Sequence, residues 1–329
     1  MRYARYFACS VACATAMFPA LAVGEPTTLR FGVIAASMRL FQSAPIYVAQ
    51  QKGMFERQDL AVTIVPLPGV EHMINELDKG AVDVSITATP YLVKAALNGS
   101  DAVAVVGGPA NTIYSIVAKP GISSFDDLRG KTIAMSLPED MISVTTRLIL
   151  AKHGLQEANF IAKQLIGTPL RAKCLETEEC AAAPLSQPDD IIFARKGFKL
   201  LANSHEVIPT MQFTVIAARR SWAGQHKDAV VRFARAIGNA YQFTRDPANR
   251  DEVVAIAAKE TGTSDEISRE IYKLYYEPDL GVMPKHGEIS VPGFSKVIEL
   301  LGSSGMLQKP LPSAGSFIDL QFLEAAGMQ

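Results

Sequence analysis

Hydrophobic positions in the first part of the chain alternate between two periods, which predicts strands separated by short helices. In the segment 70–79, for example, Val70, Met73, Ile74 and Leu77 fall on one helical face. Strands separated by helices imply parallel pairing with right-handed crossovers. The predicted strands are residues 29–34, 61–65, 82–86 and 102–106, and the predicted helices are residues 45–57, 70–79 and 91–97.

A second series of strand and helix patterns begins at residue 113. One helix is predicted over residues 138–153, ending at Gly154, and the stretch 168–190 shows no clear period. The last apolar strand of this series is suited to return the chain to the first series. The predicted strands are residues 113–118, 132–135, 160–165, 191–193, 199–201 and 212–217.

The last third of the chain shows helical periodicity almost throughout. Its longest predicted helix has Val230, Phe233, Ala234, Ile237 and Tyr241 at helical spacing. The predicted helices there are residues 227–244, 252–261, 265–275 and 290–301.

The amino-terminal residues have the pattern of an export signal. Arg2 and Arg5 form a short positive region, residues 7–21 are apolar and uncharged, and Ala20-Leu21-Ala22 is a small-x-small cleavage site. A lipid anchor requires a cysteine at the cleavage point, and Cys9 and Cys13 come too early for that. We therefore expect residues 1–24 to be removed and the mature protein to carry no lipid anchor.

Length and charge narrow the class of the mature protein. About 305 residues are long for a single core, so two lobes are expected. Without Arg2 and Arg5, thirty basic residues face 33 acidic ones, which gives a net charge near −3. No basic stripe is visible, and a nucleic-acid partner is not expected.

Two cysteines remain after the signal, Cys174 and Cys180. In an oxidising compartment we expect a local disulfide between them, the alternative being two unpaired thiols. A metal site is not expected, because His153 is the histidine nearest to either cysteine in sequence and no second cysteine pair exists. No cofactor motif is present, so no cofactor is expected.

Four segments resemble the type II periplasmic solute-binding proteins of ABC importers. Within that class they are most similar to the group that binds sulfonates, taurine, nitrate and thiamine-precursor pyrimidines. The third segment is the most specific, because its Asp-Asp-Leu-Arg-Gly-Lys turn leads into the second lobe. The segments are residues 45–56, 77–86, 122–134 and 212–222.

The resemblance implies an α/β fold of two lobes, each a mainly parallel sheet flanked by helices, with a ligand cleft between them. Lobe 1 is expected to comprise residues 25–113 and 218–329, and lobe 2 residues 114–217. The implied function is the periplasmic substrate-binding component of an ABC importer. The implied partners are a small-molecule ligand and a permease in the inner membrane, and we expect a monomer.

Loops that follow the strands are the candidate walls of the cleft, because ligands in open α/β sheets lie beyond the carboxyl ends of parallel strands. The candidates combine aromatic and apolar side chains with hydroxyls, glycines and two arginines. They are Ser37, Met38, Arg39, Phe41, Gln42, Gly69, Thr87, Thr89, Tyr91, Gly108, Met141, Thr168 and Arg171.

The charge of the ligand stays open at this stage. Arg39 is placed to clamp a carboxylate with its bidentate fork, or it is a solvated loop residue. A neutral ligand would instead be held by stacking and by Ser or Thr hydroxyls. Pro138, Glu139 and Asp140 stand where this group often has a Gly/Ser-rich loop, which disfavours a sulfonate or nitrate at that end.

Two other function classes are alternatives to a transport receptor. A receptor for a membrane sensor would use the same pocket. An exported enzyme on the same fold is less favoured, because the chain lacks a Gly-x-Ser-x-Gly elbow, a dinucleotide fingerprint and a phosphate loop, and its five histidines are scattered.

Export is directly testable. We predict that protein recovered from the periplasm begins at Val23 or Glu25, because cleavage follows a small-x-small site. Amino-terminal sequencing of that fraction measures this, and an intact Met1 would contradict the prediction.

Overall fold

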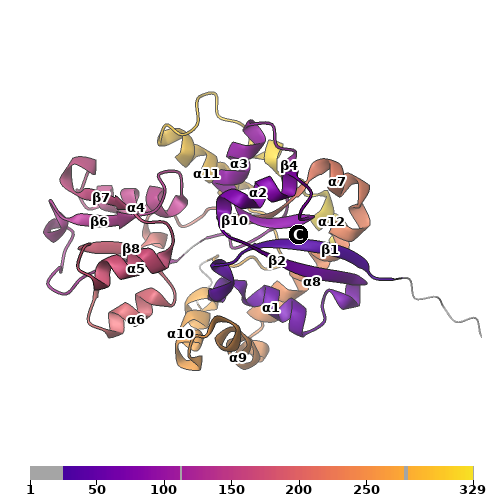
Figure 1. Ribbon diagram of the computed structural model, residues 1–329, viewed down its shortest axis with the longest axis horizontal. Coiled ribbons are helices and arrows are strands. Elements are labelled where there is room, and N and C mark those ends of the chain that lie inside the picture. The colour runs from indigo at the N-terminus through magenta and orange to yellow at the C-terminus, as the bar shows by residue number, and fades with distance from the viewer. Residues whose placement is uncertain (1–24, 112, 278–280, 329) are drawn as a thin grey trace, which may run out of the picture.

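The computed structural model describes residues 25–111, 113–277 and 281–328. The predicted signal peptide, residues 1–24, lies outside the described residues. Two five-stranded sheets lie side by side, each covered by helices, and each forms the centre of one lobe (Figure 1). The two-lobe α/β architecture predicted from the sequence is therefore confirmed.

The sheet of lobe 1 has the order β2-β1-β3-β10-β4. β1 pairs in parallel with β2 and β3, whereas β10 is antiparallel to both β3 and β4. The reversed strand is the one that follows the return from lobe 2. Its strands are β1 (Thr27–Ile34), β2 (Leu60–Leu67), β3 (Val84–Ala88), β4 (Ala102–Gly107) and β10 (Thr214–Arg219).

The sheet of lobe 2 repeats this plan with the order β7-β6-β8-β5-β9. β6 is parallel to β7 and β8, and β5 is antiparallel to β8 and β9. Here too the reversed strand is the first one after a crossing between the lobes. The strands are β5 (Tyr114–Ala118), β6 (Thr132–Met135), β7 (Ile161–Gln164), β8 (Ala182–Ser186) and β9 (Lys199–Asn203).

Helices cover both faces of each sheet (Figure 1). Lobe 2 carries α4 (Met141–Lys152), α5 (Thr168–Glu176) and α6 (Asp189–Arg195). Lobe 1 carries α1 (Ala44–Gln51), α2 (Val70–Asp78), α3 (Thr89–Leu97), α7 (Arg220–Gln225), α8 (Lys227–Arg245), α9 (Arg250–Thr261), α10 (Asp265–Tyr276), α11 (Val291–Ser303) and α12 (Gln321–Ala326). Short 3₁₀ turns include η1 (Ser37–Arg39), η2 (Phe41–Ser43), η3 (Glu56–Gln58), η4 (Asp126–Leu128), η5 (Glu157–Asn159), η6 (Ser204–Glu206), η7 (Pro247–Asn249) and η8 (Ala314–Phe317).

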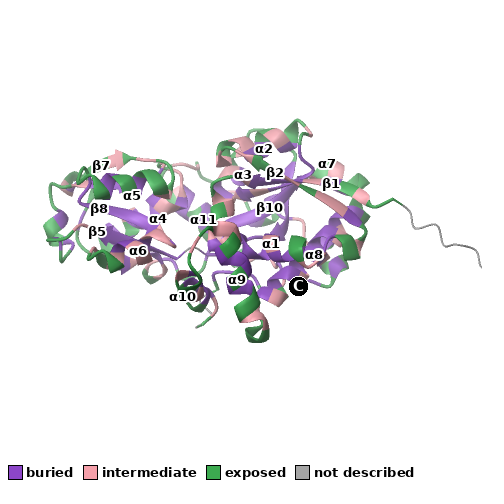
Figure 2. Ribbon diagram, turned by 60° about the horizontal axis from the view of Figure 1, so that its bottom comes forward, coloured by how far each residue is buried: buried purple, intermediate pink, exposed green. Residues whose placement is uncertain are grey.

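The long helix α8 shows how the hydrophobic pattern builds the core of lobe 1. Its apolar face is buried against the sheet, and the ring of Phe233 lies between Phe31 of β1 and Phe55. The Phe233 ring meets Phe31 edge-on at 5.1 Å and stacks on Phe55 at 5.8 Å. Burying one such ring contributes roughly 1.5–3 kcal/mol. Figure 2 colours each residue by its burial: β8 and β10 are mostly buried, whereas β7 is mostly exposed.

Several predicted elements differ from the structure. The predicted strand 191–193 lies within helix α6, because a short apolar run fits a half-buried helix turn as well as a strand. The predicted helix 45–57 ends at Gln51, before Gly53 with φ of 61°. The predicted helix 138–153 begins only at Met141, because the Asp140 carboxylate accepts the Ile142 N–H as a cap.

The return to lobe 1 also comes earlier than we predicted. We placed residues 114–217 in lobe 2, but β10 begins at Thr214 and pairs along its length within the sheet of lobe 1. Its apolar sequence suits a central strand of lobe 1, buried between β3 and β4. The chain therefore crosses between β4 and β5 and again between η6 and β10, and the described residues of these two crossings are 108–111 with 113, and 207–213.

These two crossings are hydrogen-bonded to each other. The Phe213 N–H donates to the Ala110 carbonyl at 2.8 Å, and the Thr214 N–H donates to the Pro109 carbonyl at 3.0 Å. Close approach is possible because Gly108 lacks a side chain, and a Cβ there would lie 2.5 Å from Thr214 Oγ1. The crossings thus behave as one paired ribbon.

The buried Gln212 side chain ties this ribbon to two helices. Its Nε2 donates to the Thr214 carbonyl at 2.7 Å, and its Oε1 accepts the Ser290 N–H at 2.8 Å, just before α11. The Gln212 carbonyl accepts the Thr89 hydroxyl at 2.6 Å, at the start of α3. Gln212 therefore fixes both helix starts relative to the crossings.

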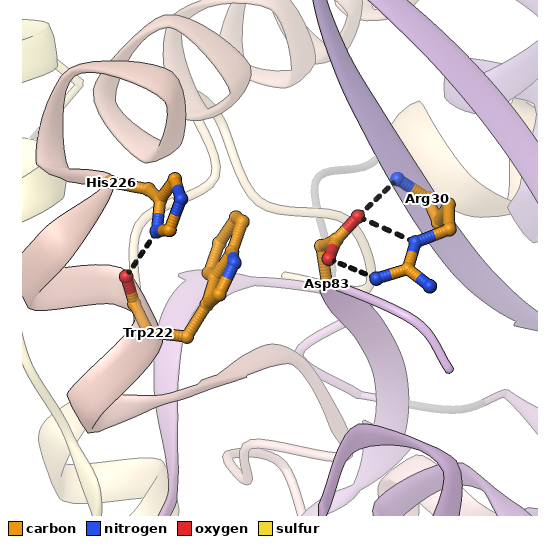
Figure 3. A network of polar contacts seen from close by, with 4 residues as sticks. All are labelled: Arg30, Asp83, Trp222 and His226. Atoms are coloured by element: carbon orange, nitrogen blue, oxygen red, sulfur yellow. Dashed lines mark hydrogen bonds and ion pairs between the residues drawn. The ribbon is translucent and has the colours of Figure 1, made fainter. Parts of the chain in front are cut away.

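At the amino-terminal end of β3, Asp83 forms a salt bridge with Arg30 of the neighbouring strand β1 (Figure 3). Asp83 Oδ2 accepts the Arg30 backbone N–H and Nε–H, and Oδ1 accepts from Nη2 at 2.6 Å. Nearby, the Trp222 ring stacks on His226 with centroids 4.6 Å apart. The Arg30–Asp83 contacts thus join β1 to the start of β3, and the Trp222–His226 stack lies at the end of α7.

In lobe 2, a disulfide joins Cys174 and Cys180, whose Cα atoms lie 5.3 Å apart. Both residues are buried, and the bond links the end of α5 to the segment that enters β8. Among the described residues, the helices are too short or too polar to cross a bilayer.

The Gln212 contacts generate a stability prediction. We expect Gln212→Met to lower the free energy of unfolding by about 1–3 kcal/mol, because it leaves the Ser290 N–H and buried carbonyls without their partner. Urea unfolding followed by circular dichroism measures this. Gln225→Met, at an exposed position, is the control, and equal effects of both variants would contradict the role of Gln212.

Candidate functional site between the lobes

The facing edges of the two sheets form the candidate site. In lobe 1 the carboxyl ends of β1, β3 and β4 lead into η1, α3 and the first crossing. In lobe 2 the carboxyl ends of β6, β7 and β8 lead into α4, α5 and α6. Because parallel strands present helix starts and loops at this edge, the loops of both lobes meet across the crossings.

A pocket of about 240 Å³ lies between the lobes at this junction. Its walls are mostly apolar, with one phenol, one ammonium and one carboxylate. Lobe 1 supplies the start of α3 and the end of α11, and lobe 2 supplies the loop before α4. The lining residues are Pro90, Tyr91, Lys94, Pro138, Glu139, Leu301, Met306 and Leu307.

Beneath this pocket, an apolar cluster joins the lobes. Met141 and Val144 of α4 pack with Val297 and Leu301 of α11, and Met211 of the second crossing completes the contact. Met141 is 2% exposed, so its side chain serves this packing. Figure 1 shows α4 and α11 facing each other at this place.

Tyr91 is the central polar side chain of the pocket. Its hydroxyl oxygen is shielded from solvent, and nothing in the described part of the chain hydrogen-bonds to it. Burial raises the pKa of Tyr91 well above its usual value, and the negative charges of Asp140, Glu139 and Glu71 raise it further. The phenol is therefore protonated, and it stands in a negative field.

Lys94 and Glu139 face each other across the pocket from different lobes. Lys94 Nζ lies 3.9 Å from Glu139 Oε1, and the side chains are 65% and 31% exposed. A pair this open contributes little to stability. Either partner is therefore able to exchange its contact for a ligand group at small cost.

Arg171, which we predicted as a ligand residue, is instead engaged inside lobe 2 at 1% exposure. Its Nε donates to the Pro184 carbonyl at 2.9 Å, and its other nitrogens donate to the Leu165 carbonyl and the Thr168 hydroxyl. Burial lowers the pKa of Arg171, although the nearby charge of Asp140 opposes this. Arg171 and Thr168 together hold the start of α5.

A buried polar network on the other side of the cleft was missed by sequence reasoning. It joins Ser115 and Asp190 of lobe 2, through Gln187, to Tyr275 of lobe 1. Burial raises the pKa of Asp190 to about 6, against the stabilising hydrogen bonds from Ser115 and Gln187. The apparent strand 191–193 concealed the helix start that carries Asp190.

The predicted residues after β1 separate into two groups. The Phe41 ring is 3% exposed and meets the rings of Tyr275 and Tyr272 edge-on, which places it in the lobe 1 core. Arg39 is exposed on η1, which packs against α9. Ser37 and Met38 offer backbone carbonyls to Ser43 and Tyr47, and Gln42 is half-buried beside them.

The remaining predicted residues lie at the starts of helices and at the crossings. Thr89 is buried and bonded to Gln212, and Gly108 belongs to the first crossing. Gly69 precedes α2, whose Glu71 side chain folds back over it. Thr87 is fully buried, and its hydroxyl has no partner among the described residues.

Metal-ligating side chains do not gather in this region. Across residues 25–111, 113–277 and 281–328, no group of three His, Cys, Asp or Glu side chains is arranged to hold a metal ion.

Comparison with known proteins places this arrangement in a family. The protein family described as NMT1/THI5 like matches residues 40–249. A candidate binding protein of Bacillus subtilis (strain 168), YtlA, is 25% identical over 307 residues, which cover 90% of each chain.

Two solved structures show the same fold. The periplasmic nitrate-binding protein NrtA from Synechocystis PCC 6803 has a TM-score of 0.74 at 16% identity, covering 92% of this chain and 89% of its own. The alkanesulfonate-binding protein SsuA from Xanthomonas axonopodis pv. citri, bound to MOPS, has a TM-score of 0.67 at 19% identity, covering 89% and 98%. The resemblance and function predicted from the sequence agree with these relatives, which are named as binding proteins. The chain belongs to the NMT1/THI5-like family.

Proposed function

We propose that this protein is the periplasmic substrate-binding component of an ABC importer. It captures a small organic solute between its lobes and delivers it, as a monomer, to a permease in the inner membrane. The observation that carries the proposal is the pocket whose walls come from both lobes on either side of a paired crossing. A solute in that position is enclosed when two lobes close around it.

The proposal favours a binder over an enzyme because, among the described residues, the buried charged side chains are already engaged. Asp190 accepts hydrogen bonds from Ser115 and Gln187, and Arg171 donates to backbone carbonyls and Thr168. General acid–base chemistry needs such a group within reach of substrate. A receptor for a membrane sensor would use the same pocket and differs only in its membrane partner.

The chemistry of the pocket supports a particular ligand class. Proline, leucine and methionine side chains form a largely apolar wall, which suits a flat or apolar body. Tyr91, Lys94 and Glu139 supply the polar contacts. The carboxylates of Asp140, Glu139 and Glu71 around Tyr91 outnumber the Lys94 ammonium, which is paired with Glu139, so the local field is negative. An oxyanion would be repelled there, so we propose a neutral or cationic ligand with an N–H or O–H donor.

Thermal-shift screening tests both the role and the ligand class. The panel for the mature protein contains nitrate, alkanesulfonates, organic acids, pyrimidines and aromatic amines. A compound that binds only the folded protein raises its Tm. We expect the largest rise from a pyrimidine or an aromatic amine. A rise from sulfonates or nitrate alone would contradict the ligand class, and no rise across the panel would contradict the solute-binding role.

Calorimetric titration of that compound then locates it. We expect Tyr91→Phe to weaken binding about tenfold, because the phenol loses its hydrogen bond to the ligand. Tyr276→Phe, whose hydroxyl bonds to Thr244 within lobe 1, is the matched control.

Arg39 remains the test of the carboxylate alternative. For a neutral or cationic ligand, Arg39→Ala should bind as the unmodified protein does, and so should the control Arg57→Ala at an exposed turn. A loss of about 2–4 kcal/mol in Arg39→Ala alone, the cost of unpairing a buried charge, would reinstate a carboxylate ligand.

A further inference from the structure

The lobes also meet on the side of the pocket opposite to α4 and α11, where α6 faces α10 (Figure 1). At the surface, Arg195 of α6 pairs with Glu266 and Glu270 of α10 at 3.1 and 2.8 Å. These exposed pairs contribute little by themselves. The specific contact lies deeper, between Tyr275 of α10 and Gln187 in the loop before α6.

This deeper contact is one buried hydrogen bond. The Tyr275 hydroxyl donates to Gln187 Oε1 at 3.2 Å, and the two residues are 5% and 2% exposed. The Tyr275 ring is held in lobe 1 by an edge-on contact with Phe41 at 5.7 Å. The hydroxyl therefore projects from a fixed position toward lobe 2.

The orientation of the Gln187 amide is set by Asp190. A carboxylate accepts hydrogen bonds and cannot donate them, so the Gln187 Nε2 faces Asp190 Oδ2, at 2.7 Å. The amide oxygen is then left to face Tyr275. Asp190 is itself fixed by the Ser115 hydroxyl at 3.0 Å and the Ile191 N–H at 2.8 Å, and it is 3% exposed.

We propose that Asp190 is a positioning residue for lobe closure, which holds the Gln187 amide so that its oxygen receives the Tyr275 hydroxyl when the lobes meet. The network lies within lobe 2 except for this last hydrogen bond. Lobe 2 therefore carries a preformed acceptor, the Gln187 amide oxygen. Closing the cleft adds the one hydrogen bond from Tyr275 that joins this network to lobe 1. The net contribution of one buried hydrogen bond is enough to shift the equilibrium between open and closed forms several-fold. This contact therefore favours the closed form.

The test measures the distance between the lobes in the ligand-free mature protein, so that it stands apart from the identity of the solute. A fluorophore pair on an exposed residue of each lobe reports the closed and open populations by single-molecule energy transfer. We expect Tyr275→Phe to lower the ratio of closed to open molecules roughly three- to tenfold. Tyr276 is the next residue of α10, and its hydroxyl donates to Thr244 within lobe 1. Tyr276→Phe therefore removes no contact between the lobes and should leave the closed-to-open ratio unchanged.

The positioning role of Asp190 is tested in the same assay. Asp190→Asn keeps one acceptor oxygen and replaces the other with an NH₂ group, so it cannot accept from both the Ile191 N–H and the Gln187 amide. The closed-to-open ratio should therefore fall toward that of Tyr275→Phe. The double variant should be no worse than either single one, because both remove the same contact. Ser115→Ala, a milder change to the same carboxylate, should lower the ratio in the same direction if Asp190→Asn fails to fold.

Two results would overturn the proposal. One is a closed-to-open ratio in Tyr275→Phe that equals that of Tyr276→Phe. The other is an additive double variant, which would mean that Asp190 affects the lobes by a separate route.

Discussion

The paired crossings around Gln212 are the constraint on which the rest of the molecule depends. Backbone hydrogen bonds join the two crossings, and the Gln212 side chain joins them to α3 and α11. The start of α3 carries Tyr91, and the end of α11 supplies the apolar wall of the pocket. A single buried amide thus sets where one half of the pocket lies relative to the axis about which the lobes would move.

Around this axis the two lobes touch in chemically different ways. On one side, Met141 and Val144 pack against α11, and such apolar contacts tolerate small sliding movements. On the other side, Tyr275 meets Gln187 through a hydrogen bond that requires one geometry. The pocket lies on the apolar side, beside the packing of α4 against α11, and this packing can adjust when a solute binds. On the polar side, the hydrogen bond between Tyr275 and Gln187 defines the closed position of the lobes.

Much of the fold could be predicted because it is local. Period-two and period-3.6 patterns placed most strands and helices, whereas the Asp-Asp-Leu-Arg-Gly-Lys turn lies between β5 and β6, inside lobe 2 and after its entry. The site was less accessible. Tyr275 and Gln187 are 88 positions apart, and only the folded chain brings them together. Arg171 looks like a ligand clamp in sequence, yet Pro184 and Thr168 take up its donors. Phe41 likewise became core because α10 covers it.

The central claim is that a solute is held between the lobes, with contacts from both. A crystal structure of the mature protein, grown with the compound that most raises its Tm, tests this most directly. The account predicts electron density in the pocket between Tyr91 and Glu139, with a ligand donor within hydrogen-bond distance of at least one of them and an apolar body against Leu301 and Met306. A ligand bound to one lobe alone, or at a surface distant from this pocket, would contradict it.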